Sequence, residues 1–230
     1  METKILASLM VIGLVASAIG MGTYAYFSDT ETSTGNTFTA GSIDLKIDLD
    51  RDGQGIWDLK DLGAGDKFFD YSDIKPGDSG ELTVSLHVYN NDAWACFYIK
   101  PTTDSDNSCT EPESEEETDC TDTGDGELDN YLMFRIWEDD GDNIYENEEI
   151  LLTYCGSTGS EWCYLSDIDP NGEVWPLGKL TASTTYYFGI EWKLPWETGN
   201  EVQTDKWSAD VWFYVEQAKN NENFVCPPIQ

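Results

Sequence analysis

Apolar and polar side chains alternate with a period of two along several stretches of this chain, and this pattern limits the fold more than any other feature. In residues 81–89, Leu82, Val84, Leu86 and Val88 fall on one face of an extended strand and polar residues fall on the other. The same alternation marks residues 42–49, 94–99, 131–137, 184–194 and 208–217. Beyond the N-terminal apolar run, no stretch carries an apolar period of 3.6 residues, so we expect an all-β fold.

Turn-forming residues separate these stretches, at Pro76-Gly77, Asn90-Asn91, Asn171-Gly172 and residues 198–200. Several short strands with such punctuation are typical of two packed antiparallel sheets. We therefore predict a jelly-roll-like β-sandwich that forms a single domain over residues 41–230.

The N-terminus has the features of an export signal. An apolar run over residues 5–22 precedes a small-x-small site at Thr23 and Ala25, which predicts a cleaved signal peptide at residues 1–25. The alternative is a retained anchor, because the run approaches the length that spans a membrane. Either way we expect an extracellular or cell-surface protein. With the cleaved signal, it meets the membrane only through this segment before cleavage.

The chain is strongly acidic, with a formal net charge of −33. Such a surface repels phosphate, which excludes nucleic acid as a partner, and it attracts cations. Residues 102–130 hold twelve acidic residues and no basic one, so we expect a solvated insertion between two strands.

An even number of cysteines behind an export signal indicates disulfides. The short intervening loops suggest that Cys109 pairs with Cys120 and Cys155 with Cys163, which leaves Cys96 for Cys226. Zinc is the competing interpretation, but the chain has no C-x₂-C pair and a single histidine, His87.

Two segments match the first half of an oxygen-ligand calcium loop, in which alternate side chains converge on the ion before a glycine. Neither segment has the glutamate that such a loop carries at its twelfth position, so a polar turn is the alternative interpretation. Calcium is the only cofactor that we expect, and its candidate ligands are Asp48, Asp50 and Asp52 in the first segment and Asp167, Asp169 and Asn171 in the second.

No catalytic residues are predicted. The chain lacks an H-E-x-x-H motif, and one histidine cannot supply a site with two or three histidine ligands. The sequence around Ser79 imitates a serine-protease motif, yet eight residues along one strand place His87 roughly 26 Å from that serine.

Residues 22–31 (GTYAYFSDTE) and 37–45 (TFTAGSIDL) resemble the start of proteins of the TasA/camelysin family. Further similarities are Ile74-Lys75-Pro76-Gly77-Asp78-Ser79 before a strand, Trp192-Lys193-Leu194-Pro195 with Asn200 and Gln203, and the closing Glu216-Gln217-Ala218. The acidic insertion and the cysteines depart from the bacterial pattern, which favours a relative of archaeal bundling pili.

The resemblance implies a jelly-roll subunit that polymerises outside the cell into filaments or pili of a biofilm matrix. The family also carries a protease label, but the residues of this chain lead us to expect no enzymatic activity. Its partner is then another copy of itself, in a head-to-tail homopolymer joined by donor-strand complementation. Residues 26–40 are the expected donor strand, with Tyr26, Phe27 and Phe38 as its large apolar groups. The alternatives are a camelysin-like secreted metalloprotease and a non-polymerising surface adhesin with a retained anchor.

Overall fold

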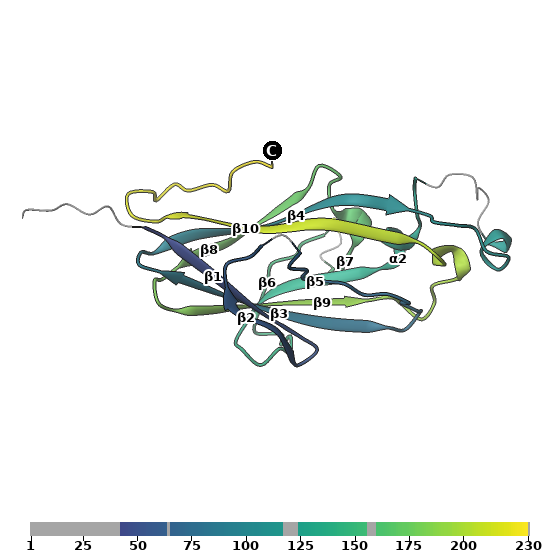
Figure 1. Cartoon of the computed structure of the whole chain (residues 1–230), viewed down its shortest axis with the longest axis horizontal. Coiled ribbons are helices and arrows are strands. Elements are labelled where there is room, and N and C mark those ends of the chain that lie inside the picture. Colours follow the sequence, from purple (N-terminus) through teal and green to yellow (C-terminus); the bar gives the residue numbers. More distant parts are fainter. Residues whose placement is uncertain (1–41, 64, 117–123, 156–159, 230) are drawn as a thin grey trace, which may run out of the picture. The chain divides into compact units, whose positions relative to one another are not determined.

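Two antiparallel sheets face each other in the structure, a computed structural model that describes residues 42–63, 65–116, 124–155 and 160–229 (Figure 1). This architecture confirms the predicted all-β sandwich. The expected signal peptide (1–25) and the expected donor residues Tyr26, Phe27 and Phe38 lie outside the described residues.

The larger sheet has the strand order β2-β1-β3-β9-β5-β6 among the described residues, and β7 also pairs with β5. Its strands are β1 (Asp44–Arg51), β2 (Gln54–Lys60), β3 (Ser79–Tyr89), β5 (Met133–Asp139), β6 (Ile150–Leu151), β7 (Cys163–Tyr164) and β9 (Thr185–Lys193).

The smaller sheet has the order β10-β4-β8, with bounds Lys206–Gln217, Ala93–Ser105 and Glu173–Leu180. Short helical turns connect the sheets at η1 (Glu113–Glu115), α2 (Leu128–Tyr131), η2 (Leu165–Asp167) and η3 (Asn200–Val202).

The core lies between the two sheets, as the alternation of β3 predicts. Leu82, Val84, Leu86 and Val88 are each no more than 2 % exposed. From the facing sheet, the ring of Phe97 stacks on Trp175 with centroids 5.6 Å apart. Burial of these apolar side chains supplies the main stabilisation of the sandwich.

All six predicted strands are present, whereas β2, β6, β7 and β8 were not predicted from the sequence. β8 contains Pro176 and Gly178, which normally argue against a strand, and its register with β4 shifts at Ala95 and Cys96. The strand tolerates proline because it lies at an edge of the smaller sheet, where one side of the backbone needs no partner.

The C-terminal tail covers the outer face of the smaller sheet. A disulfide joins Cys96 of β4 to Cys226, with Cα atoms 6.0 Å apart. The indole of Trp94 donates a hydrogen bond to the carbonyl of Asn221 (2.7 Å) and stacks on the ring of Phe224. The tail is therefore anchored to β4 by covalent, polar and aromatic contacts.

The structure confirms the disulfides Cys96–Cys226 and Cys155–Cys163. Cys109 is also disulfide-bonded, and Cys120, its expected partner, lies outside the described residues.

The expectation for the acidic insertion needs correction. β4 continues through residues 102–105, and Asp106 and Glu113 are only 2 % and 0 % exposed. Part of this segment is therefore packed against the domain, because neighbouring backbone groups hydrogen-bond these carboxylates.

Candidate functional site

β10 presents an open sheet edge. It pairs with β4 along its length, from Lys206 opposite Ser105 to Gln217 opposite Ala93. Within the described residues, no strand pairs with its second edge. An open edge offers backbone N–H and C=O groups to an additional strand.

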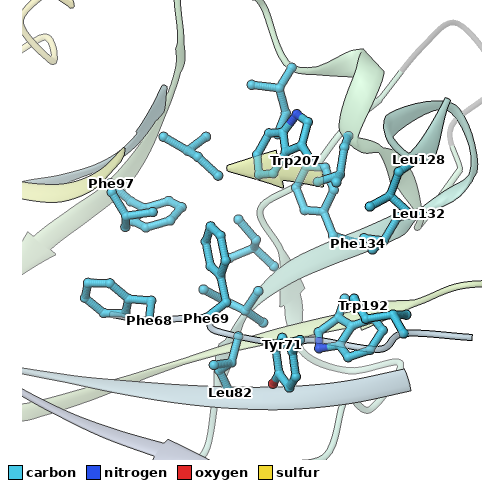
Figure 2. A pocket seen from close by; sticks show the side chains of 17 residues that line it. Phe68, Phe69, Tyr71, Leu82, Phe97, Leu128, Leu132, Phe134, Trp192 and Trp207 are labelled. Carbon is cyan, nitrogen blue, oxygen red and sulfur yellow. The ribbon is translucent and has the colours of Figure 1, made fainter. Parts of the chain in front are cut away.

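An apolar cavity of about 130 Å³ lies beside this strand, between the two sheets (Figure 2). Such a cavity has room for apolar side chains and offers few polar partners to water. The side chains that line it come from both sheets, from α2 and from the β2–β3 connection, and they include Phe69, Phe97, Phe134, Trp192, Trp207 and Val211.

The β2–β3 connection (residues 61–78) separates β10 from the larger sheet and carries aromatic side chains into the cavity. Phe68 contacts Phe213 of β10 with ring centroids 5.8 Å apart, and Phe69 stacks on Trp207 at 6.2 Å. On the opposite side, Tyr71 lies 4.7 Å from the indole of Trp192. The connection therefore places side chains, and not a paired strand, between β10 and the larger sheet.

Arg51 at the end of β1 holds this connection in place. Its guanidinium donates hydrogen bonds to the carbonyl oxygens of Lys67 (3.2 Å) and Phe68 (2.9 Å). The same group lies 5.4 Å from the ring centroid of Tyr71, a distance at which a cation attracts an aromatic face. Burial raises the pKa of the Tyr71 hydroxyl above its ordinary value.

The first predicted calcium segment is a strand followed by a turn rather than a compact loop, and calcium binding to it stays a prediction. Asp48 and Asp50 lie within β1, where successive side chains on one face stand roughly 6–7 Å apart and do not converge. Asp52 follows in a turn with a φ of 51°, and its Oδ1 accepts a hydrogen bond from the Glu81 N–H (3.0 Å). The spacing of Asp48 and Asp50 at every second residue therefore reflects the alternation of side chains along β1.

The second predicted calcium segment is a capped turn, and calcium binding to it also stays a prediction. Asp167 accepts a hydrogen bond from the N–H of Tyr164 (2.8 Å). Asp169 Oδ1 accepts hydrogen bonds from the backbone and the side chain of Asn171. These carboxylates accept hydrogen bonds from nearby backbone N–H groups, which is the geometry expected of a polar turn.

A different group of carboxylates does converge, and the sequence analysis missed it. Asp106, Glu113 and Asp205 each place a carboxylate oxygen within 4.8 Å of those of the other two. Burial raises the pKa of Asp205 to about 7. No local motif marks the group, because the pairing of β4 with β10 brings Asp106 close to Asp205, while Glu113 comes from η1.

A sandwich of two antiparallel sheets with an apolar cavity beside an open edge strand defines a class of protein that can accept an additional strand. The family model for the camelysin metallo-endopeptidases matches residues 1–125, which is more than half of the chain. The chain therefore belongs to the camelysin family, as its resemblance to TasA/camelysin proteins predicted. No curated protein matches it. Among the described residues, no helix has the length and apolar character needed to cross a membrane.

The family description implies a catalytic metal, and the residues of this chain do not fit the usual hydrolytic zinc site. His87, the only histidine in the sequence, lies on β3 with Nδ1 3.1 Å from Thr185 Oγ1. Ser79 lies at the opposite end of β3 from His87, where it pairs with Lys193 of β9. The described cysteines are held in disulfides. No hydrolytic step follows from these groups.

Proposed function

We propose that this protein is a secreted structural subunit that polymerises into extracellular filaments or pili of a biofilm matrix. In this mechanism, residues 26–40 of one subunit add as a strand to the open edge of β10 in the next. The observation that carries the proposal is the open edge of β10 beside an apolar cavity lined by both sheets.

The lengths of the two segments support this pairing. β10 has twelve residues, which extend over about 40 Å at about 3.3 Å per residue. Fifteen residues, the length of segment 26–40, would span about 50 Å if they were extended in the same way. The expected donor segment is therefore long enough to follow the whole edge.

The composition of the donor segment supports the same mechanism. Tyr26, Phe27 and Phe38 are separated by a polar stretch, so the segment has too little apolar surface to fold alone. Beside β10 its backbone gains a ladder of hydrogen bonds and its rings gain an apolar environment. Because the donor and the acceptor are different surfaces, this contact does not close on itself and generates a filament.

Two alternatives remain distinguishable by experiment. The family description favours an endopeptidase, which would hydrolyse casein and lose this activity with a chelator. A surface adhesin would keep residues 1–25 and form no fibres. N-terminal sequencing and a casein assay on the purified protein separate both from the filament subunit.

The direct test is negative-stain microscopy of the purified protein and of a variant that lacks residues 26–35. We expect fibres from the first and only folded monomers from the second, with unchanged circular dichroism. A matched control permutes the polar residues 28–34 at constant length and composition, and it should still form fibres. Fibres of normal length from the truncation would exclude the mechanism.

A further inference from the structure

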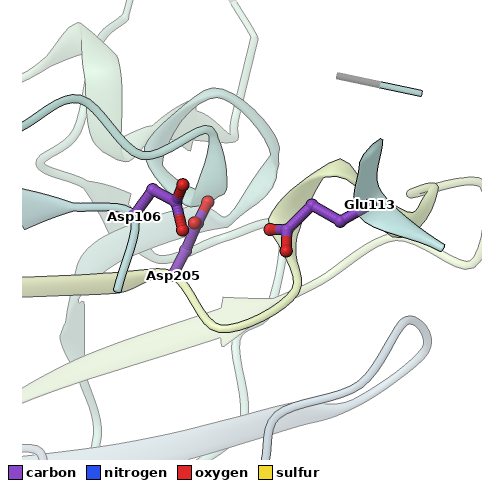
Figure 3. A group of neighbouring side chains, drawn as sticks. All are labelled: Asp106, Glu113 and Asp205. Carbon is purple, nitrogen blue, oxygen red and sulfur yellow. The ribbon is translucent and has the colours of Figure 1, made fainter. Parts of the chain in front are cut away.

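Three carboxylates from separate segments meet at one end of the β4–β10 ladder (Figure 3). Asp106 directly follows β4, Asp205 directly precedes β10, and Glu113 lies in η1 of the acidic insertion. Figure 3 shows their carboxylates directed toward a common space. The group therefore lies where the insertion joins the smaller sheet.

Burial of these carboxylates costs hydration free energy when no cation is bound. Asp106 and Glu113 are 2 % and 0 % exposed, and Asp205 is half-buried. None of the ion pairs found among the described residues includes any of the three, so no lysine or arginine there compensates them. A buried carboxylate is stable only when a partner offsets its lost hydration.

Each carboxylate is anchored by one oxygen and leaves the other without a hydrogen bond. Asp106 Oδ1 accepts from the N–H of Ser108 (3.0 Å), and Glu113 Oε2 accepts from the N–H of Thr110 (2.8 Å). Asp205 Oδ2 accepts from the N–H of Leu128 (2.9 Å). The second oxygens, Asp106 Oδ2, Glu113 Oε1 and Asp205 Oδ1, are buried and have no hydrogen-bond partner in the described structure.

We infer that Asp106, Glu113 and Asp205 bind a calcium ion. The backbone donors orient each carboxylate and leave one oxygen free, as a metal ligand requires. A set of oxygen ligands suits a hard divalent cation, and calcium accepts irregular carboxylate sites more readily than magnesium, which demands a near-ideal octahedron.

The ion fixes the acidic insertion to the sandwich. It links the end of β4, the start of β10 and η1, three segments that repel one another through their charges when it is absent. This site is independent of the donor-strand mechanism, because its residues do not line the cavity beside β10.

Calorimetric titration of the chelator-treated protein with calcium chloride tests the site, with magnesium chloride in a parallel titration. We expect one saturable calcium site per chain and weaker magnesium binding. Asp106→Asn, Glu113→Gln and Asp205→Asn should each weaken calcium binding at least about tenfold, because each removes one ligand charge. The matched control is the double variant Asp58→Asn/Glu222→Gln, which removes two exposed charges and should bind calcium like the unaltered protein.

Thermal unfolding supplies a second readout that separates binding from folding. With a chelator, the neutral variants should be as stable as the unaltered protein or more so, because they relieve repulsion. With calcium, the unaltered protein and the control should gain more stability than the three variants, because the gain decreases as the dissociation constant rises. Glu113→Gln lies outside both sheets, so it remains informative if a change beside β4 prevents folding.

Several outcomes would overturn the assignment. These are the absence of saturable binding at millimolar calcium, binding by all three variants that is as tight as that of the unaltered protein, loss of binding in the control, or a preference for magnesium. A variant that is less stable both with calcium and with chelator, while its calcium affinity is unchanged, would show that the carboxylate serves only the local hydrogen bonds.

Discussion

The indole of Trp137 packs against the backbone of Gly189 on the neighbouring strand. The two residues are opposite each other in the β5–β9 pair, on the outer face of the larger sheet. Trp137 is only 1 % exposed, and its Nε1 donates a hydrogen bond to Asp139 Oδ1 (3.2 Å). A large aromatic side chain is thus buried outside the core because its neighbour has no side chain.

Gly189→Ala should destabilise the fold. A Cβ at this position would overlap the indole ring of Trp137, which must then move. Overpacking of this kind costs about 1–3 kcal/mol, measurable as a lower free energy of unfolding in urea. Gly55→Ala in β2 is the control, because a Cβ there meets no atom within 4 Å. Equal stability of the two variants would contradict the packing argument.

Loss of the Cys96–Cys226 disulfide should cost more stability than loss of Cys155–Cys163. The bridges have sequence separations of 130 and 8 residues, which correspond to roughly 5 and 2.5 kcal/mol of loop-closure entropy. The first bridge also anchors the tail over β4. Paired Cys→Ser variants, compared by urea unfolding, test the order, and a larger loss from the short loop would refute it.

The carboxyl of Glu81 should make stability fall as the pH rises toward neutrality. Burial is the main cause that raises its pKa to about 7, and the charges of Asp139, Asp50 and Asp52 add to it. In the unfolded chain this group ionises near its ordinary value of 4.5. Between these values the folded state binds more protons than the unfolded state, so stability decreases from about pH 4.5 to about pH 7.

Glu81→Gln should flatten this decline, since the amide cannot ionise. The comparison requires a chelator, so that calcium does not contribute, and the exposed Glu222→Gln serves as the control. Glu191, opposite Glu81, keeps its ion pair with Arg135 in both variants. An unchanged slope of melting temperature against pH in Glu81→Gln would show that this carboxyl does not control the decline.

The sequence predicts the parts of the fold that depend on local pattern. The alternation in residues 81–89 identifies β3 because its apolar side chains face one core. Short loops also suggested the Cys155–Cys163 pair. β8 was missed because Pro176 is tolerated only at an edge, and edge position is a property of the whole sheet.

The candidate sites were harder to predict for the same reason. Asp48, Asp50 and Asp52 match a calcium loop in spacing, but the backbone there is a strand followed by a turn. Asp106 and Asp205 are far apart in sequence and meet only because β4 and β10 pair. Local spacing therefore selected residues that do not converge and gave no signal for those that do.

The aromatic residues of the donor segment provide the last prediction. If Phe27 and Phe38 anchor residues 26–40 in the apolar space beside β10, then Phe27→Ser/Phe38→Ser should abolish fibres. Each fully buried phenylalanine contributes roughly 1.5–3 kcal/mol, so loss of both weakens the contact by at least about a hundredfold. The monomer should keep its circular dichroism and melting temperature, because the proposed mechanism places both rings against the neighbouring subunit. Ser28→Ala/Thr30→Ala is the matched control and should assemble normally.

Fibre mass, measured by sedimentation over a range of protein concentrations, gives the critical concentration for assembly. An equal critical concentration for the phenylalanine variant and the control would show that these rings do not anchor the donor strand.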